Sequence, residues 1–399
     1  MTVTPEGYLA IAYALAGPGA WALFAFVAVK GRARLKIRPE PMPTLDAPPA
    51  ATLIVPCRNE AAGIADCLRS ALAQDYAPLQ VIAVDDRSDD GTAEAIDALA
   101  AIEPRLKTLH VRDGELPPGW LGKPNAVCRG VEASSGEWLV FIDSDCTLDP
   151  TAVRQAITTG VKREFDLVSF VPRFEPASFW DAVVTPLCSM ATGGMYSMIW
   201  ANARNRPQTA FACGQFIAVR RAAYEQVGGH AAIADSAGED VELARRMKRA
   251  GLSPRIGWGM ELVSTRMYST LGDLFNGWGR NFIAASRGRT ARVWGAIAFL
   301  LLCTLSVWPA AVAGIVHDVA FNGRIWLALA CVHYLLITAV LADGYRWGRV
   351  RPLYALLWPL GTLVLLLIFA KSLYLSTRRQ VVWRGTRYDL KPLSTGNPS

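Results

Sequence analysis

Residues 138–145 read WLVFIDSD, five apolar residues in a row followed by two aspartates that a single serine separates. An unbroken apolar run of this length is typical of a strand covered on both faces of a parallel sheet. Ligands bind at the carboxyl ends of such strands, which is the position of Asp143 and Asp145. Side chains two residues apart point to the same face of an extended chain, so both carboxylates can meet one Mg2+ or Mn2+ ion. Alone, Asp-x-Asp is more often a turn or a helix cap, but the strand before it favours the metal site.

The chain before this stretch alternates short apolar runs with segments of helical spacing. The runs cover residues 52–55, 81–84 and 109–111. Strands that alternate with helices in this way indicate an α/β fold, in which a mostly parallel, Rossmann-like sheet carries helices on both faces. The carboxyl ends of the runs are therefore the place to look for a site.

Polar residues follow the first two runs. The first run leads into Pro56, Arg58 and Glu60, and the second into Asp85 and Asp86. A helix cap accounts for the serine and aspartates that come after the second pair, but not for the pair itself. No GxGxxG motif follows the first strand and no Walker P-loop is present, so we expect a phosphate-directed site without either common phosphate cradle.

A second acidic pair, Glu239-Asp240, opens a segment with helical apolar spacing. Carboxylates at a helix start are favoured by the helix dipole, which accounts for Glu239 without any function. Asp240 is the better candidate for a general base that activates a hydroxyl beside a bound sugar. Nearby, His230 is either a metal or acceptor contact or a loop residue fixed by its neighbours. Residues 211–215 form either the floor of an acceptor site or the entry to a packed strand.

Composition points to a membrane protein. Hydrophobic residues make up 52% and charged residues 19% of the 399 residues, which is more apolar than a typical soluble domain. The net charge of +7 comes from basic segments beside long apolar runs, whereas the rest of the chain is net acidic. The expected partner is therefore an anionic bilayer surface and not a nucleic acid. Four runs are about long enough to cross a bilayer: 7–29, 293–316, 325–342 and 353–376.

The positive-inside rule places the residues after the first run in the cytoplasm of an integral inner- or plasma-membrane protein. The predicted segments are an N-terminal transmembrane anchor at 1–30, a basic and proline-rich linker at 31–50, a cytoplasmic α/β domain at 51–265, an interfacial amphipathic segment at 266–292, transmembrane or re-entrant helices at 293–376 and a basic cytoplasmic tail at 377–399. Three crossings after residue 292 would put the basic tail outside. We therefore expect a hairpin that turns at residues 319–323, followed by a re-entrant or interfacial run.

The ordered motifs of the chain resemble the inverting, nucleotide-sugar-dependent glycosyltransferases of family 2, which have a GT-A fold. The resemblance covers about residues 50 to 290. It rests on VPCRNE at 55–60, VDDRSDDGT at 84–92, GKPNA at 122–126, DSD at 143–145 and the pair Glu239-Asp240. It implies a divalent metal, a nucleotide-sugar donor such as a UDP-sugar, and transfer with inversion.

The resemblance also implies roles for individual residues. The nucleoside pocket would be lined by Pro56, Arg58 and Glu60, and the nucleobase or ribose would be contacted by Asp86 with support from Asp85. The nucleotide side would be approached by Lys123, the ribose or metal shell by Asp143, and the metal would be bound by Asp145. The general base would be Asp240 with help from Glu239, and closure over the diphosphate or acceptor would fall to Trp278 and Arg280.

Within that family, three stretches look most like membrane-bound enzymes that glycosylate carotenoids and related terpenoid lipids. They are RMY at 266–268, GWGRNF at 277–282 and WRGTRY at 383–388. Processive cellulose and hyaluronan synthases and ceramide glucosyltransferases carry Gln/Arg-x-x-Arg-Trp in the corresponding place, and this chain does not. The expected acceptor is thus a carotenoid, hopanoid or other glycolipid precursor. A polyprenyl phosphate or exopolysaccharide acceptor is the alternative, and a scaffold without activity is the least favoured reading.

Residues 174–200 are too apolar for a solvated helix face. They form either a core helix pair, broken at Pro186 and at Gly193-Gly194, or an interfacial element at the entry of a lipid acceptor. The similar mix of aromatic and basic residues at 271–282 favours the interfacial element.

Overall fold

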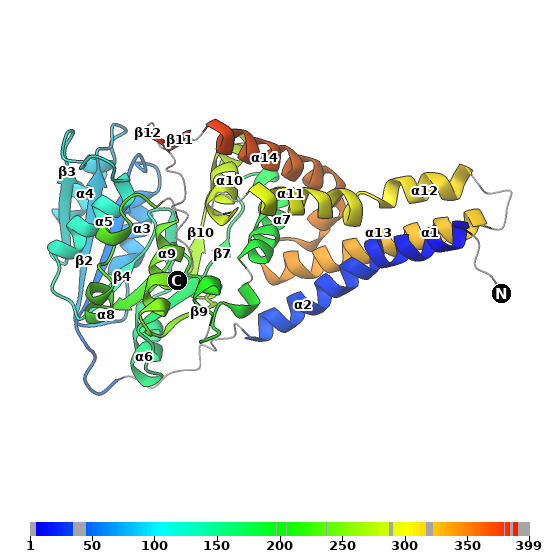
Figure 1. Ribbon diagram of the computed structural model, residues 1–399. Helices are drawn as coiled ribbons and strands as arrows, with labels where there is room; N and C mark the ends of the chain where they lie inside the picture. The colour runs from blue at the N-terminus through cyan, green and yellow to red at the C-terminus, as the bar shows by residue number, and fades with distance from the viewer. Residues whose placement is uncertain are drawn as a thin grey trace.

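The computed structural model describes residues 5–34, 45–196, 198–204, 206–236, 238–286, 290–316, 322–378, 380–383 and 386–389. A sheet domain lies at one end of the molecule, long apolar helices extend at the other, and a layer of helices lies between them (Figure 1). Residues 35–44 of the predicted linker, residues 319–321 of the predicted turn at 319–323, and residues 379, 384–385 and 390–399 of the predicted tail lie outside the described residues.

Within the described residues the main sheet has seven strands in the order β3-β2-β1-β4-β8-β6-β9. Their bounds are β1 Ala51–Cys57, β2 Leu79–Asp86, β3 Leu106–Val111, β4 Trp138–Phe141, β6 Leu167–Val171, β8 Ile217–Arg220 and β9 Pro254–Trp258. All neighbours are parallel except β8, which runs antiparallel to both β4 and β6. The prediction of a mostly parallel sheet is therefore confirmed, with one reversed strand.

Helices cover both faces of the sheet, as predicted. On one face Leu53 and Val140 pack against α3 (Ile64–Leu72), α4 (Thr92–Ala100) and α6 (Ala152–Lys162). On the other face Ile54 and Leu139 pack against α5 (Gly122–Glu132), α8 (Arg221–Gln226) and α9 (Glu239–Arg249). Successive residues of one strand thus belong to two different cores, which explains why these strands read as unbroken apolar runs.

The strand register collects the functional motifs at one edge. Cys57 of β1 pairs with Asp85 of β2, so the polar residues after both strands lie side by side. Phe141, the last residue of β4, pairs with Ile217, the first residue of β8. Because β8 is reversed, the loop that precedes it lies at the same edge as the carboxyl ends of the parallel strands. A smaller sheet beside this edge is formed by β5 (Cys146–Leu148), β10 (Val263–Thr265) and β7 (Arg173–Phe174).

The layer between the sheet domain and the long helices is built from α7, α10, α11 and α14. Their bounds are α7 Phe179–Met195, α10 Leu271–Ser286, α11 Thr290–Phe299 and α14 Trp358–Arg378, with short turns η2 Met198–Trp200, η3 Pro207–Thr209, η4 Ala231–Ile233 and η6 Pro352–Leu357. Helix α14 packs against α7 and α10. Helix α7 continues through Pro186, so the expected break of this segment at Pro186 is wrong. Proline has no backbone N–H, so one hydrogen bond of the helix is missing at this turn. Packing of α7 against α10 and α14 keeps the helix continuous.

Four helices of the described chain are long and apolar enough to cross a membrane: Gly7–Ala33, Thr290–Val316, Gly323–Trp347 and Pro352–Arg378. They comprise α1 Pro5–Ala14, η1 Leu15–Gly19, α2 Ala20–Arg34, η5 Leu300–Thr304, α12 Val307–Val316, α13 Asn322–Trp347, η6 and α14, and a hairpin of β11 Gln380–Trp383 and β12 Thr386–Asp389 follows. They coincide with the predicted spans, and they make the chain a membrane protein by length and composition. Whether each helix crosses the bilayer stays a prediction.

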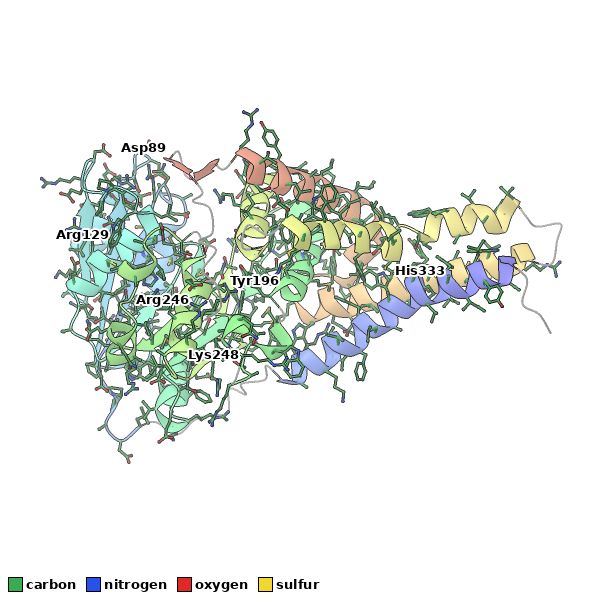
Figure 2. All side chains as sticks on the ribbon, in the orientation of Figure 1. Asp89, Arg129, Tyr196, Arg246, Lys248 and His333 are labelled. Carbon is green, nitrogen blue, oxygen red and sulfur yellow. The ribbon has the colours of Figure 1, made fainter. Side chains whose placement is uncertain are left out.

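Hydrogen bonds between side chains and backbone tie the long helices together. The carbonyl of Cys303, in the π-helical turn η5, accepts hydrogen bonds from Trp21 Nε1 at 2.8 Å and from His333 Nε2 at 3.0 Å. Tyr13 lies on the other side of this imidazole, with its Oη 2.8 Å from Nδ1. His333 lies among the long helices, away from the sheet domain (Figure 2). A π-turn frees a carbonyl from its usual partner, and here two neighbouring helices satisfy it.

Candidate active site

Lys123 joins two of the predicted acidic groups. It stands at the start of α5, and its Nζ lies 2.6 Å from Asp143 Oδ1 and 2.6 Å from Glu239 Oε1. Burial lowers the pKa of the ammonium, but Asp143, Glu239 and Asp240 outweigh it and hold the pKa of Lys123 well above its usual value. The structure therefore brings the end of β4, the start of α5 and the start of α9 to one point.

Asp240 is held in a fixed orientation by backbone donors. Gly214 N donates to its Oδ2 at 2.9 Å, and Val241 N donates to its Oδ1 at 2.7 Å. A Cβ atom on Gly214 would lie 3.2 Å from Lys123 Nζ and 3.3 Å from Asp240 Oδ2, so a side chain here would crowd both groups. The loop before β8 thus forms one wall of the site, and its role as the floor of an acceptor site stays a prediction.

The environment of Asp240 suits a general base. Burial and then the neighbouring Glu239 carboxylate raise the pKa of Asp240 to about 7, while Lys123 acts in the opposite direction. A carboxyl group with a pKa near neutrality exchanges a proton with a hydroxyl far more readily than an ordinary aspartate does. The same helix start that favours Glu239 as a capping carboxylate thus also holds a base.

Asp145 lies next to this group, on the side of β1. Burial, followed by Asp143 and Glu60, raises the pKa of Asp145 to about 7. Among the described residues no basic side chain lies within ion-pair distance of Asp145, and its Oδ1 accepts only a weak hydrogen bond from Cys146 Sγ at 3.5 Å. Several carboxylates without a matching cation are unfavourable in a buried place. A divalent cation would balance this charge.

The donor set fits a Mg2+ or Mn2+ ion that the protein holds by few ligands. In the described part of the chain no group of three or more His, Cys, Asp and Glu side chains is arranged to hold a metal. One oxygen of Asp143 already meets Lys123, which leaves Asp145 as the main candidate ligand. Mg2+ is commonly bound through one or two carboxylates, with water and substrate phosphates in the other positions.

The second strand end forms an adjacent polar pocket. Arg87 donates to both carboxylate oxygens of Asp86, at 2.8 and 3.1 Å, and Arg58 Nη1 lies 4.0 Å from Asp86 Oδ2. Asp85 Oδ1 and Asn125 Nδ2 are buried and have no hydrogen-bond partner among the described residues. Buried polar atoms are usually satisfied by another protein group or an ordered water, so these two atoms are candidates for a partner that the described residues do not supply.

Two further predicted residues line the same edge. Pro56 borders a narrow cavity together with Lys123, Asp143 and Asp240. Glu60 accepts a hydrogen bond from Ser144 Oγ at 3.1 Å, which fixes the serine between the two aspartates of the DSD motif. The structure therefore places both residues next to the groups that the sequence assigns to donor binding.

His230 lines this cavity but is fixed by its neighbours. It is 3% exposed, its ring meets Phe141 edge-on with centroids 5.2 Å apart, and Tyr224 Oη lies 3.0 Å from its Nδ1. Burial lowers the pKa of His230 to about 3, so the ring is neutral at physiological pH. These contacts match the alternative of a structurally fixed loop residue, and the ring remains close enough to shape the cavity wall.

The two residues expected to close the site lie in the helical layer. Trp278 on α10 is 4% exposed, and its Nε1 donates to Thr185 Oγ1 of α7 at 3.3 Å. Arg280, two residues later, acts electrostatically on Tyr268, as does Asp145. Trp278 packs within the layer, and Arg280 lies on the same helix, α10. Their part in closure stays a prediction.

The comparisons with known proteins agree with this geometry. The family model described as glycosyl transferase family 21 matches residues 18–395. The chain belongs to glycosyl transferase family 21. Membership of this family confirms that the chain is a glycosyltransferase, while the narrower assignment to family 2 stays a prediction.

Individual relatives extend the comparison. A 4,4'-diaponeurosporenoate glycosyltransferase of Staphylococcus aureus (strain USA300) is 24% identical over 345 residues, which is 86% of this chain and 88% of that protein. Its counterpart from strain MRSA252 is 25% identical over the same shares. The mannosyltransferase PcManGT from Pyrobaculum calidifontis, solved in complex with GDP-Man and Mn2+, aligns with a TM-score of 0.51 over 92% of this chain and 98% of that chain, at 21% identity. The fold of this family 21 chain is thus that of a GT-A-like glycosyltransferase.

Several residues of the site did not stand out in the sequence. Gly214 and Asn125 are parts of longer stretches and Arg87 is part of the second strand end, and none of the three carries a signal of its own in the sequence. Gly122 matters because a Cβ atom there would overlap the Asp86 carboxylate. The signal for Gly214 was weak because its place depends on the reversed direction of β8, which apolar spacing does not reveal.

Proposed function

We propose that this family 21 enzyme transfers one sugar, with inversion, from a nucleotide-sugar donor to a lipid acceptor at the cytoplasmic surface of the membrane. The observation that carries the proposal is the convergence of Asp240, Gly214, Lys123 and Asp143 at one sheet edge. The edge lies beside a layer of helices that continues into four apolar spans (Figure 1). A donor from the soluble side and an acceptor from the bilayer can meet there.

Asp240 performs the proton transfer in this proposal. Its carboxylate accepts the proton of the acceptor hydroxyl while that oxygen attacks the anomeric carbon from the face opposite the diphosphate. The bond from the anomeric carbon to the diphosphate oxygen breaks in the same step, and its electron pair leaves with the nucleoside diphosphate. Gly214 N keeps the carboxylate oriented, and Glu239 holds its pKa near neutrality.

The negative charge of the leaving diphosphate is stabilised by three groups in this proposal: Lys123, Arg280 and the metal ion that Asp145 would hold. Lys123 is a buried cation that can turn from Asp143 to a phosphate oxygen. Asp145, with Asp143, would hold the divalent ion, which supplies positive charge to the diphosphate as the bond breaks. Arg280, which follows Trp278 on α10, is the second protein cation of this proposal.

The nucleoside is assigned to the pocket of Arg58, Asp85, Asp86 and Asn125. The unpartnered oxygen of Asp85 accepts, and the unpartnered amide of Asn125 donates. A uracil presents an N–H donor beside two carbonyl acceptors, so these groups suit a UDP-sugar. The mannosyltransferase of the same fold holds GDP-Man, so donor choice is an outcome of the experiment below.

A membrane lipid that carries a hydroxyl is the proposed acceptor because two relatives are named 4,4'-diaponeurosporenoate glycosyltransferases and because the helical layer beside the site continues into four apolar spans. A carotenoid, hopanoid or similar glycolipid precursor is the proposed class. The test incubates membranes that contain the protein with UDP- and GDP-sugars and a total lipid extract, and analyses the products by mass. A lipid heavier by one sugar supports the proposal, a polyprenyl phosphate sugar or a polymer supports the alternative acceptor, and free sugar alone contradicts both.

A further inference from the structure

A second cavity, of about 450 Å3, lies apart from the small cavity at Asp240. Its walls are the strand end at Arg173 and Glu175, the residue after β10, Arg266, and Arg349 in the connection between α13 and η6. Strands β7 and β10 lie between the main sheet and the helical layer (Figure 1). The cavity is therefore at the boundary between the catalytic domain and the membrane helices.

Positive charge predominates in the lining of this cavity. Glu175 is shared by two arginines: Arg173 Nη2 donates to its Oε1 at 2.7 Å, and Arg266 Nε donates to its Oε2 at 3.2 Å. Arg349 pairs with Glu261, which lies outside the lining. One carboxylate balances only one of two guanidinium groups, so the cavity retains an excess of positive charge. Guanidinium groups in this arrangement bind phosphate in bidentate geometry.

The predicted spans would put the cavity at the level of the lipid headgroups. Arg349 stands between two candidate spans that end at Trp347 and begin at Pro352. A connection this short between two spans remains at the bilayer surface. Apolar side chains flank it on the membrane side: Phe179 is 49% exposed and Leu353 is 74% exposed. Arginines next to exposed apolar residues at the end of a span are typical of contact with a lipid headgroup and its first acyl carbons.

We propose that this cavity binds the phosphate of an anionic phospholipid from the leaflet that the catalytic domain faces. Arg173 and Arg349 contact the phosphate from opposite walls, and Glu175 limits affinity because it competes for Arg173 and Arg266. The bound headgroup links the small sheet to the α13–η6 connection and so fixes the catalytic domain against the membrane helices. The residues that line this cavity differ from those around Asp240, but the backbone N–H of Arg266 donates to the carbonyl of Asp145 at 3.2 Å, so the cavity adjoins the candidate metal site.

The experiment measures lipid retention by native mass spectrometry of the full-length protein in a non-ionic detergent. The protein is incubated with phosphatidylglycerol or with phosphatidylcholine, and the retained lipid is counted. Wild type is expected to retain phosphatidylglycerol in preference. R173Q and R349Q are each expected to lower its affinity about fivefold, which corresponds to the roughly 1 kcal/mol that one arginine contributes near an anionic membrane surface. R173K, which keeps the charge, should lose less. R105Q is the matched control, because Arg105 pairs with Glu103 at 3.2 Å at the start of β3, on the soluble domain.

Two further arms keep the outcome decisive if an arginine variant fails to fold. E175Q removes the competing carboxylate and should raise phosphatidylglycerol retention above wild type, which misfolding cannot produce. An excess of inorganic phosphate tests the source of the anion. Equal retention of both lipids, no change in R173Q, R349Q and E175Q, or full displacement of the lipid by inorganic phosphate would each overturn the proposal.

Discussion

Asp240 experiences opposing influences on its pKa, and their balance sets the pH at which the enzyme works. Burial and Glu239 raise the pKa of Asp240 to about 7, and Lys123 lowers it. The base must be ionised to accept a proton, so activity increases with pH through this pKa. Below pH 7, we expect kcat/KM to fall about tenfold for each pH unit.

The variant E239Q tests whether Glu239 raises the pKa that controls kcat/KM. Removing the Glu239 carboxylate removes a cause that raises the pKa of Asp240, so the acidic limb of the kcat/KM profile should move to lower pH. The measurement is initial rate against pH at saturating metal. A limb that stays in place, or that moves to higher pH, would show that another group controls the profile.

A second prediction concerns Asp145 as a ligand of the divalent metal. Among the described residues it has acidic neighbours and no ion-pair partner, which suits a bound divalent cation. In D145N, the Mn2+ concentration that gives half-maximal activity should rise at least about tenfold, because the loss of one ligand costs at least as much as the loss of an outer hydrogen bond to a metal site. D113N, on an exposed loop, is the control. An unchanged Mn2+ requirement in D145N would argue against its role as a ligand.

At the scale of single residues, the sequence predicted the acidic groups but not all of their partners. Asp143, Asp145 and Asp240 follow recognisable signals, a strand end or a helix start, and the structure brings Asp143, Asp240 and Lys123 together beside Gly214. The contact from Gly214 to Asp240 was not predictable, because it joins residues whose proximity depends on the direction of β8.

The loop before β8 is the element that sets the geometry of the site. In G214A the new Cβ atom would press on both Lys123 Nζ and Asp240 Oδ2. Displacements of a few tenths of an ångström at a positioned base are costly, so we expect kcat/KM to fall about tenfold with unchanged thermal stability.

Gly63 provides the matched control for this loop. A Cβ atom at Gly63 would meet nothing within 4 Å, so G63A should behave as wild type. The two variants are compared by initial rates and by thermal unfolding in detergent. Equal activity of G214A and G63A would mean that the loop does not hold Asp240 in its working position.

Elements with a strong pattern were predicted well, and elements set by packing were not. β1, β2 and β4 are unbroken apolar runs because each is covered on both faces, and this pattern is visible in the sequence. The reversal of β8 leaves no such mark, because an antiparallel central strand is buried in the same way. Continuity of α7 through Pro186 depends on contacts with α10 and α14, which lie far along the chain.

The arrangement of the whole molecule raises the question of where the C-terminus lies. Helix α14 packs against α7 and α10, close to the sheet domain, whereas α12 and α13 extend away from it (Figure 1). That the last apolar run is re-entrant or interfacial stays a prediction. A reporter fused after Ser399 should therefore give a cytoplasmic signal. A periplasmic signal would mean that the run from Pro352 to Arg378 crosses the bilayer.

The activity of purified D240N tests most directly whether Asp240 removes the proton from a lipid hydroxyl. Labelled nucleotide sugar, Mn2+ and the lipid acceptor are supplied, and the label in the lipid phase is counted alongside donor binding. Wild type should label the lipid, and D240N should lose about 100-fold or more of this activity while binding the donor as wild type does, because a positioned base contributes at least that factor. Lipid labelling by D240N within tenfold of wild type would contradict the account.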